Sequence, residues 1–169
     1  MMKKIYLALL CLFTLTVVGC NNTVANVTNG DQHITEEMHN VITDFIVERF
    51  RDSYSPTEQQ FEVHKIYGTS EENGDLKVYM WSYYSGFNRA TGVQSQAGHS
   101  LPAAITLKYD GGRYTVVGYE EPLDGSYWLS SLEEMFPKKY VKKAIRDSRN
   151  AGGLHGKMTE KVTQWLNEN

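Results

Sequence analysis

The segment from Leu76 to Tyr84 alternates like a β-strand, yet both of its faces are apolar. Its aliphatic side chains point to one side and its aromatic side chains to the other. The aliphatic set is Leu76, Val78 and Met80, and the aromatic set is Tyr79, Trp81 and Tyr83. We therefore expect a sheet whose aliphatic face carries a helix and whose other face is aromatic and mixed.

Four segments are predicted to pair as antiparallel strands. Their ranges are Phe61–Thr69, Leu76–Tyr84, Leu101–Tyr109 and Arg113–Tyr119. Asn73-Gly74 predicts a tight hairpin turn, and a second hairpin is expected about Asp110-Gly111-Gly112. Residues 85–100 are rich in Gly, Ser, Asn and Gln, and they predict a long loop between the two hairpins.

Helices are predicted on either side of this sheet in the chain. Thr35 can cap a helix whose apolar residues recur at helical spacing as far as Phe50. After the sheet, 127–136 predicts a short helix, Pro137 begins a second that ends near residue 147, and a third follows the break at 150–153. The expected class is α+β: an N-terminal helix packed on a curved four-stranded antiparallel sheet, cystatin-like or NTF2-like, followed by C-terminal helices.

The N-terminal end of the chain predicts a leader and a tether rather than part of the domain. Lys3 and Lys4 precede an uncharged, mostly apolar run from Ile5 to Val18. This run is too short to cross a bilayer as a permanent helix and is typical of a secretory signal. We expect a signal peptide at 1–19, a tether at 20–33 and one domain at 34–169.

The end of the apolar run, Val17-Val18-Gly19-Cys20, resembles the cleavage box of bacterial lipoprotein signals. The resemblance implies cleavage before Cys20, lipid on the thiol and amine of Cys20, and a place at the extracytoplasmic face of the cell membrane. Cys11 leaves with the leader, so no thiol remains for a disulfide and the fold must depend on its core. The whole chain has a net charge of −3, and loss of Lys3 and Lys4 makes it near −5, which argues against nucleic acid as a partner.

Four short runs carry a second resemblance. They are Phe61-Glu62-Val63-His64-Lys65-Ile66-Tyr67-Gly68-Thr69, Val78-Tyr79-Met80-Trp81, Asp124-Gly125-Ser126-Tyr127 and Glu134-Met135-Phe136-Pro137-Lys138. Together they resemble an uncharacterised extracytoplasmic domain of Firmicutes, which occurs alone in lipoproteins and attached to membrane metallopeptidases of the β-lactam-sensor type. The resemblance covers roughly residues 59–147 and implies a Gram-positive surface location. It carries over no catalytic residue, because the His-Glu-x-x-His helix of the peptidases is absent, and a sensory role is analogy alone.

Two sets of residues are candidate contact sites. The aromatic face of Tyr79, Trp81 and Tyr83 would hold an apolar ligand or a peptide if it is open. Alternatively, the C-terminal helices cover it, with Trp165 and Leu166 packing there. The second set is a basic run on one predicted helix: Lys138, Lys139, Lys142, Lys143 and Arg146. This run would contact anionic lipid or a cell-wall polymer, unless it is an ordinary solvated face.

The sequence thus predicts a lipid-anchored binding or accessory module with an unidentified protein partner, without a cofactor or metal and without enzymatic activity. None of its five histidines forms an i, i+4 pair, and no Gly-x-Ser-x-Gly motif is present. Two alternatives stay open. A small NTF2-like enzyme would need a buried Asp, Glu or His that faces a pocket. A cystatin-like protease inhibitor would need its hairpin tips and the 85–100 loop aligned along one edge.

Overall fold

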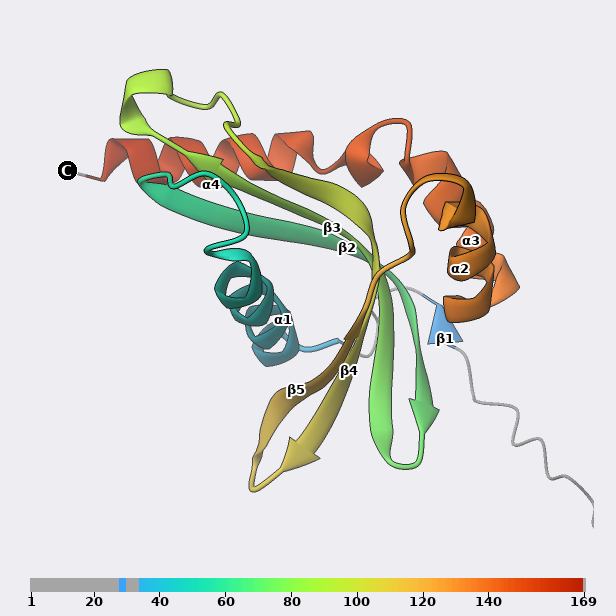
Figure 1. Ribbon diagram of the computed structural model, residues 1–169. Coiled ribbons are helices and arrows are strands. Elements are labelled where there is room, and N and C mark those ends of the chain that lie inside the picture. The colour runs from blue at the N-terminus through green and yellow to red at the C-terminus, as the bar shows by residue number, and fades with distance from the viewer. Residues whose placement is uncertain (1–27, 30–33, 169) are drawn as a thin grey trace, which may run out of the picture.

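Four long antiparallel strands form the centre of the fold in the computed structural model, which describes residues 28–29 and 34–168 (Figure 1). The strands are β2 (Gln59–Glu72), β3 (Asp75–Phe87), β4 (Gly98–Asp110) and β5 (Arg113–Glu120). Each pairs with the next along the chain. The predicted antiparallel sheet is confirmed. Both hairpins close through two-residue turns with positive φ, Asn73-Gly74 and Gly111-Gly112, as a type I′ turn requires.

Two details of the sheet differ from the prediction. The long loop predicted at 85–100 is shorter, because β3 continues to Phe87 and β4 begins at Gly98, with a 3-10 turn, η1 (Arg89–Thr91), between them. Ser85 pairs with Gly98 across the two strands. The pairing is extended by hydrogen bonds from the Ser85 hydroxyl and the Gly86 backbone to residues 95–97. In addition, two residues assigned to the tether form a short strand, β1 (Thr28–Asn29), which pairs with Gly68 and Thr69 of β2.

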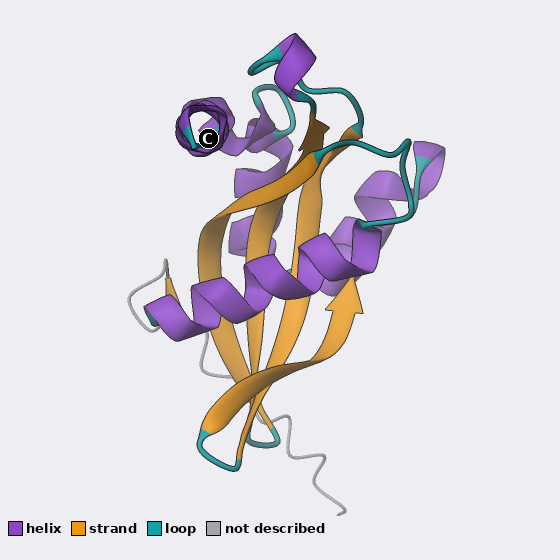
Figure 2. Ribbon diagram, turned by 90° about the vertical axis from the view of Figure 1, so that its left-hand side faces the viewer, coloured by secondary structure: helices purple, strands orange, loops and turns teal. Residues whose placement is uncertain are grey.

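Helix α1 (Glu36–Phe50) packs on the aliphatic face of the sheet (Figure 2). The hydroxyl of Thr35 caps it by accepting a hydrogen bond from the backbone N–H of Met38 at 3.3 Å. Its fully buried residues recur every four positions: Met38, Ile42 and Ile46. They contact the aliphatic side chains of β3 and β4, including Val78, Met80, Ala103 and Ile105. The predicted packing of the N-terminal helix on the aliphatic face of the sheet is confirmed.

The C-terminal helices cover the opposite face of the sheet. They are α2 (Trp128–Met135), α3 (Lys138–Asp147) and α4 (His155–Asn167), and a short 3-10 turn, η3 (Ala151–Gly153), precedes α4. Tyr79 and Trp81 are 6% and 2% exposed in a second core beneath α2 and α3. A Cβ added at Gly152 of η3 would lie 3.0 Å from the Trp81 ring. The aromatic face is therefore covered by the C-terminal helices and is not open to a ligand at Tyr79 and Trp81.

Trp165 and Leu166 cover a different part of that face from the one expected. They pack near its far end against a third cluster that includes Phe61, Phe87 and the half-buried Tyr83. The ring of Trp165 lies 6.0 Å from that of Phe61, edge to face. Tyr79 and Trp81 are therefore unavailable to an external ligand here, and only Tyr83 of the three keeps partial exposure.

Candidate functional site

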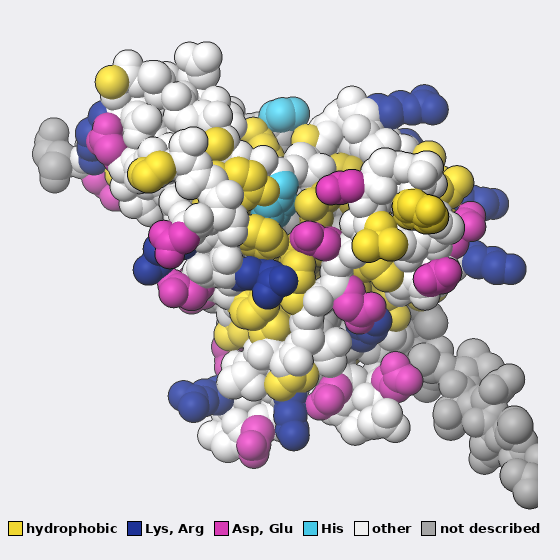
Figure 3. Space-filling model, viewed as in Figure 1, with side chains coloured by type: hydrophobic (Ala, Val, Ile, Leu, Met, Phe, Trp, Pro, Cys, Tyr) yellow, Lys and Arg dark blue, Asp and Glu magenta, His cyan; other side chains and the backbone are white. Residues whose placement is uncertain are grey.

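Helix α3 gathers the five predicted basic residues. Lys138, Lys139, Lys142 and Arg146 are exposed and Lys143 is half-buried, and Lys138 and Lys142 have no partner among the described residues. Figure 3 shows Lys and Arg side chains projecting at the edge of the molecule where Figure 1 places α3. The other two lysines lie against the helix's own tyrosine, with the Nζ atoms of Lys139 and Lys143 at 4.9 and 5.2 Å from the centroid of the Tyr140 ring. Four of the five basic residues are thus on an open face, and Lys143 is the one that is half-buried.

The same helix meets the chain where it enters the domain. The hydroxyl of Tyr140 donates a hydrogen bond to the backbone carbonyl of Thr28 in β1. Gly68 of β2 allows this approach, because an added Cβ would overlap both the Tyr140 hydroxyl and the Thr28 carbonyl. Thr28 follows Cys20 by eight positions, and a chain of that length spans at most about 29 Å. Helix α3 therefore lies beside the place where the predicted tether joins the domain.

A buried carboxylate fixes α3 to the sheet. Asp147, at the last turn of the helix, accepts hydrogen bonds from Lys65 Nζ at 2.7 Å and from the Tyr67 hydroxyl at 3.0 Å. The side chain of Asp147 is 5% exposed, whereas that of Lys65 is 38% exposed. Burial, and then the charge of Asp147, raises the pKa of Tyr67 well above its ordinary value, so its hydroxyl stays a donor.

We expect the substitution Asp147→Ala to lower the free energy of unfolding by about 1–3 kcal/mol. The Tyr67 hydroxyl would lose its buried acceptor, while the ammonium of Lys65 can turn toward water. Urea unfolding measures the change, and Glu133→Ala on the exposed part of α2 is the control, with an expected change below about 0.5 kcal/mol. Equal effects of the two substitutions would show that Asp147 does not hold α3.

A second buried carboxylate, Glu62 of β2, lies between α1 and the sheet. Its side chain is 0% exposed and accepts hydrogen bonds from Thr43 Oγ1 and Ser82 Oγ, each at 2.9 Å. His64 Nδ1 is 3.0 Å from the same carboxylate, and His64 Nε2 is 2.7 Å from His39 Nδ1. Sequence reasoning missed this cluster. The alternation of side chains along a β-strand could have revealed it, because Glu62 and His64 lie on the same face of β2 as Ile66, which packs under α1.

Beside this cluster, a cleft of about 490 Å³ opens between α1 and α4. Its lining includes His39 and His64 on one side and two lysines of α4, Lys157 and Lys161, on the other. Lys161 Nζ donates a hydrogen bond to the backbone carbonyl of Glu62 at 3.2 Å. The wall formed by α4 presents positive charge through these two lysines, and the carboxylate of Glu62 is held on the other side by Thr43, Ser82 and His64.

A third polar group inside the fold is His99, a half-buried residue at the start of β4 whose Nε2 atom is buried. Its ring stacks on Tyr84 and meets Phe50 edge to face, and its Nδ1 lies 3.2 Å from the Tyr54 hydroxyl. In the described part of the chain, its Nε2 is the buried side-chain atom left without a hydrogen-bond partner. Burial lowers the pKa of His99 to about 4, against the opposing charges of Glu121 and Glu62. The sequence had placed His99 in a loop.

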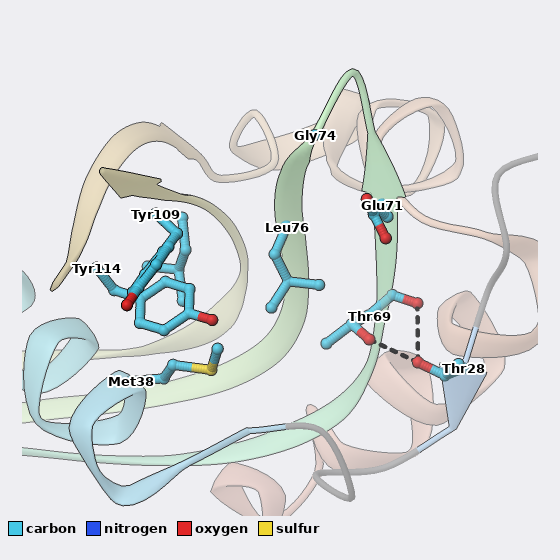
Figure 4. A pocket seen from close by; sticks show the side chains of 9 residues that line it. Thr28, Met38, Thr69, Glu71, Gly74, Leu76, Tyr109 and Tyr114 are labelled. Carbon is cyan, nitrogen blue, oxygen red and sulfur yellow. Dashed lines mark hydrogen bonds between the residues drawn. The ribbon is translucent and has the colours of Figure 1, made fainter. Parts of the chain in front are cut away.

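An open cleft of about 420 Å³ lies between the two hairpins and the first turn of α1 (Figure 4). Its apolar lining includes Leu76, Met38 and Leu107. The hydroxyls of Thr28 and Thr69 hydrogen-bond one another at 2.6 Å across one side. These two threonines satisfy each other, and the other polar side chains of the lining are Glu71, Tyr109 and Tyr114.

Comparisons with family models, with curated proteins and with solved structures gave no match. Among residues 28–29 and 34–168, no three His, Cys, Asp or Glu side chains are grouped so that they could hold a metal ion. Within the same residues, no helix has the length and apolar character needed to cross a membrane. Function must therefore be inferred from the basic helix and the cleft beside β2.

Proposed function

We propose that this chain is a lipid-anchored accessory module at the extracytoplasmic face of a Gram-positive membrane, and that α3 rests against anionic lipid headgroups. The observation that carries the proposal is the contact of α3 with Thr28, eight positions from Cys20. The lipid attachment at Cys20 lies outside the described residues and stays a prediction from the Val17-Val18-Gly19-Cys20 box. The related proposals, a cystatin-like or NTF2-like fold and kinship with the Firmicutes lipoprotein domain, are compatible with this role.

The distribution of charge favours one orientation. The chain without its leader is near −5, whereas α3 carries four lysines and Arg146 against one buried Asp147. An anionic surface attracts α3 and repels the rest of the domain, so the field turns the tethered domain with α3 inward. The like-charged neighbours Lys138 and Lys142 repel one another along the helix, and an anionic surface relieves that repulsion.

The two alternative functions have weaker support from the geometry. The inhibitor requires the hairpin tips and the loop after β3 to lie along one edge, but the tips lie at one end of the sheet and residues 88–97 at the other (Figure 1). The enzyme requires a buried acid beside a pocket, and Glu62 meets that condition. Its two oxygens are, however, held by three donors, as expected of a structural acceptor.

We expect the double substitution of Lys138 and Lys142 by Gln to weaken binding to anionic vesicles about 30-fold, because each lysine near such a surface contributes about 1 kcal/mol. Residues 21–169 contain every side chain of the three cores and can be used without the lipid. Co-sedimentation with phosphatidylglycerol vesicles at low salt measures binding, and vesicles of phosphatidylcholine alone should bind neither protein.

The matched control removes two lysines from another helix, Lys157→Gln with Lys161→Gln on α4. This variant should keep most of the binding, and added salt should release the wild type, since the Debye length is about 8 Å at physiological ionic strength. Replacement of all four lysines of α3 by Gln should abolish binding. Binding to purified anionic cell-wall polymer but not to vesicles would replace lipid with polymer as the docking surface. Equal loss in the α3 and α4 variants would refute a specific role for α3.

A further inference from the structure

The outer edge of β2 is unpaired over half of its length. Strand β1 covers only Gly68 and Thr69, so the stretch from Gln59 to Ile66 has no strand of the described chain on its outer side. This stretch passes between α1 and α4 (Figure 1). An edge of this kind offers backbone N–H and C=O groups to an added strand.

Hydrogen bonds from side chains reveal which backbone groups face outward. Lys161 Nζ donates to the carbonyl of Glu62 at 3.2 Å, and Gln59 Nε2 donates to the carbonyl of Gln60 at 3.4 Å. Because backbone direction alternates in an antiparallel strand, the N–H and C=O groups of Gln60, Glu62 and His64 all point away from β3. Flexible side chains, rather than a strand, occupy two of these carbonyls, and Glu62 as a whole is 0% exposed, so an added strand reaches its backbone only after Lys161 has moved.

Three adjoining clefts form one groove along this edge. The cleft of about 490 Å³ beside His64 shares Thr43, Glu62 and Lys161 with a cleft of about 430 Å³. The second cleft shares Gln59 and Gln60 with a third of about 310 Å³. The groove thus follows β2 from Gln59 to Ile66, about 26 Å at the rise of a β-strand. That length suits an extended segment of about eight residues.

Charge selects among extended segments. Lys157 is exposed on the wall formed by α4, and Lys161 follows it by one helical turn. The only carboxylate beside them in the lining, that of Glu62, is turned inward and bonded to Thr43, Ser82 and His64. The stretch of the groove beside His64 is therefore cationic and complementary to acidic side chains. Toward Gln59 the lining instead carries Asp44, Glu48 and Glu58 together with Arg51, so the positive charge is confined to the end beside His64.

We propose that the edge of β2 between Gln59 and Ile66 is a docking site for an extended segment of a partner protein that carries acidic side chains where it passes Lys157 and Lys161. The segment adds as a strand beside β2, displaces the Lys161 ammonium from the Glu62 carbonyl, and places carboxylates against Lys157 and Lys161. A second copy of this chain is a poorer occupant, because antiparallel pairing of two such edges brings the lysines of both α4 helices together. The proposal gives the accessory module a protein partner and does not depend on where α3 docks.

The probe is an acetylated and amidated eight-residue peptide in which glutamate alternates with valine, and its control is the same peptide with lysine for glutamate. Titration into isotope-labelled residues 21–169 is followed by backbone amide NMR. We expect the acidic peptide to shift the amides of Gln60, Glu62 and His64 and to slow their exchange with solvent, while the basic peptide leaves them unchanged. No shift, equal shifts with both peptides, or shifts confined to other elements would overturn the proposal.

Charge reversal on α4 provides the second arm. The variant Lys157→Glu with Lys161→Glu should bind the acidic peptide about tenfold more weakly than the wild type. The matched variant Lys138→Glu with Lys142→Glu on α3 should bind it with unchanged affinity. The peptide titration contains no membrane, so it tests the β2 edge alone. Vesicle co-sedimentation tests α3 alone, and either proposal can fail without the other. The same amide shifts on raising protein concentration without peptide would identify a second copy as the occupant and overturn the proposed partner.

Discussion

Replacing Glu62 with Ala is expected to lower the free energy of unfolding by about 3–5 kcal/mol. The carboxylate is fully buried and is the shared acceptor for Thr43, Ser82 and His64, which belong to α1, β3 and β2. Its loss leaves three polar groups without their acceptor and opens a cavity under α1. Chemical unfolding in urea at neutral pH measures the change.

The conservative substitution Glu62→Gln separates hydrogen bonding from charge. Glutamine keeps the shape and one acceptor oxygen, so its cost should be about 1–2 kcal/mol. The exposed control Glu133→Ala should stay within about 0.5 kcal/mol of the wild type. A loss of less than about 1 kcal/mol for Glu62→Ala would mean that the cluster does not join helix and sheet as described.

Lowering the pH from about 7 to about 4.5 should cost the folded protein about 2 kcal/mol through His99 alone. The folded pKa of about 4 lies below the ordinary value of 6.5, because burial disfavours the charged ring. Above about pH 6.5 the His99 ring is neutral in both the folded and the unfolded protein, so the free energy of unfolding does not depend on its protonation there. As the pH falls toward 4, the unfolded chain binds a proton that the folded protein refuses, and stability is lost.

The variant His99→Phe isolates this effect from the titration of carboxylates. Phenylalanine fits among Phe50, Tyr54 and Tyr84 and cannot take up a proton. The difference in unfolding free energy between wild type and variant should shift by about 2 kcal/mol across the same pH range. The nearby Glu121 and Glu62 remain in both proteins, so their own titration cancels. A difference that does not change with pH would contradict the burial of a neutral His99.

The sequence predicted the parts of the fold that depend on periodicity. The alternation of Leu76 to Tyr84 indicated two buried faces, and the four-residue recurrence of Met38, Ile42 and Ile46 marked the helix on one of them. These patterns are local, since each follows from the geometry of one strand or one helix. The short strand β1 left no such trace, because two polar residues pair with β2 only where Gly68 lets them approach.

The candidate sites were harder to predict because they join distant parts of the chain. The basic run of α3 was visible, but its contact with Thr28 spans 112 positions. Glu62 and His64 stood in a segment chosen for its β-rich character, and their burial depends on Thr43 of α1 and Ser82 of β3. His99 was placed in a loop because Gly and Ser surround it, although the aromatic side chains around it bury its ring.

The orientation of the anchored domain tests the central claim most directly. The chain has two cysteines, Cys11 in the predicted leader and Cys20 at the proposed lipid attachment, so in the proposed lipidated form a single added cysteine is labelled specifically. Ile145→Cys places a fluorophore on α3 without removing a lysine, and Val93→Cys places one on the exposed loop after β3, far from α3 (Figure 1). In phosphatidylglycerol bilayers, a quencher attached to lipid headgroups should quench the label at 145 strongly and the label at 93 weakly. Equal quenching of the two labels, or stronger quenching at 93, would contradict docking through α3.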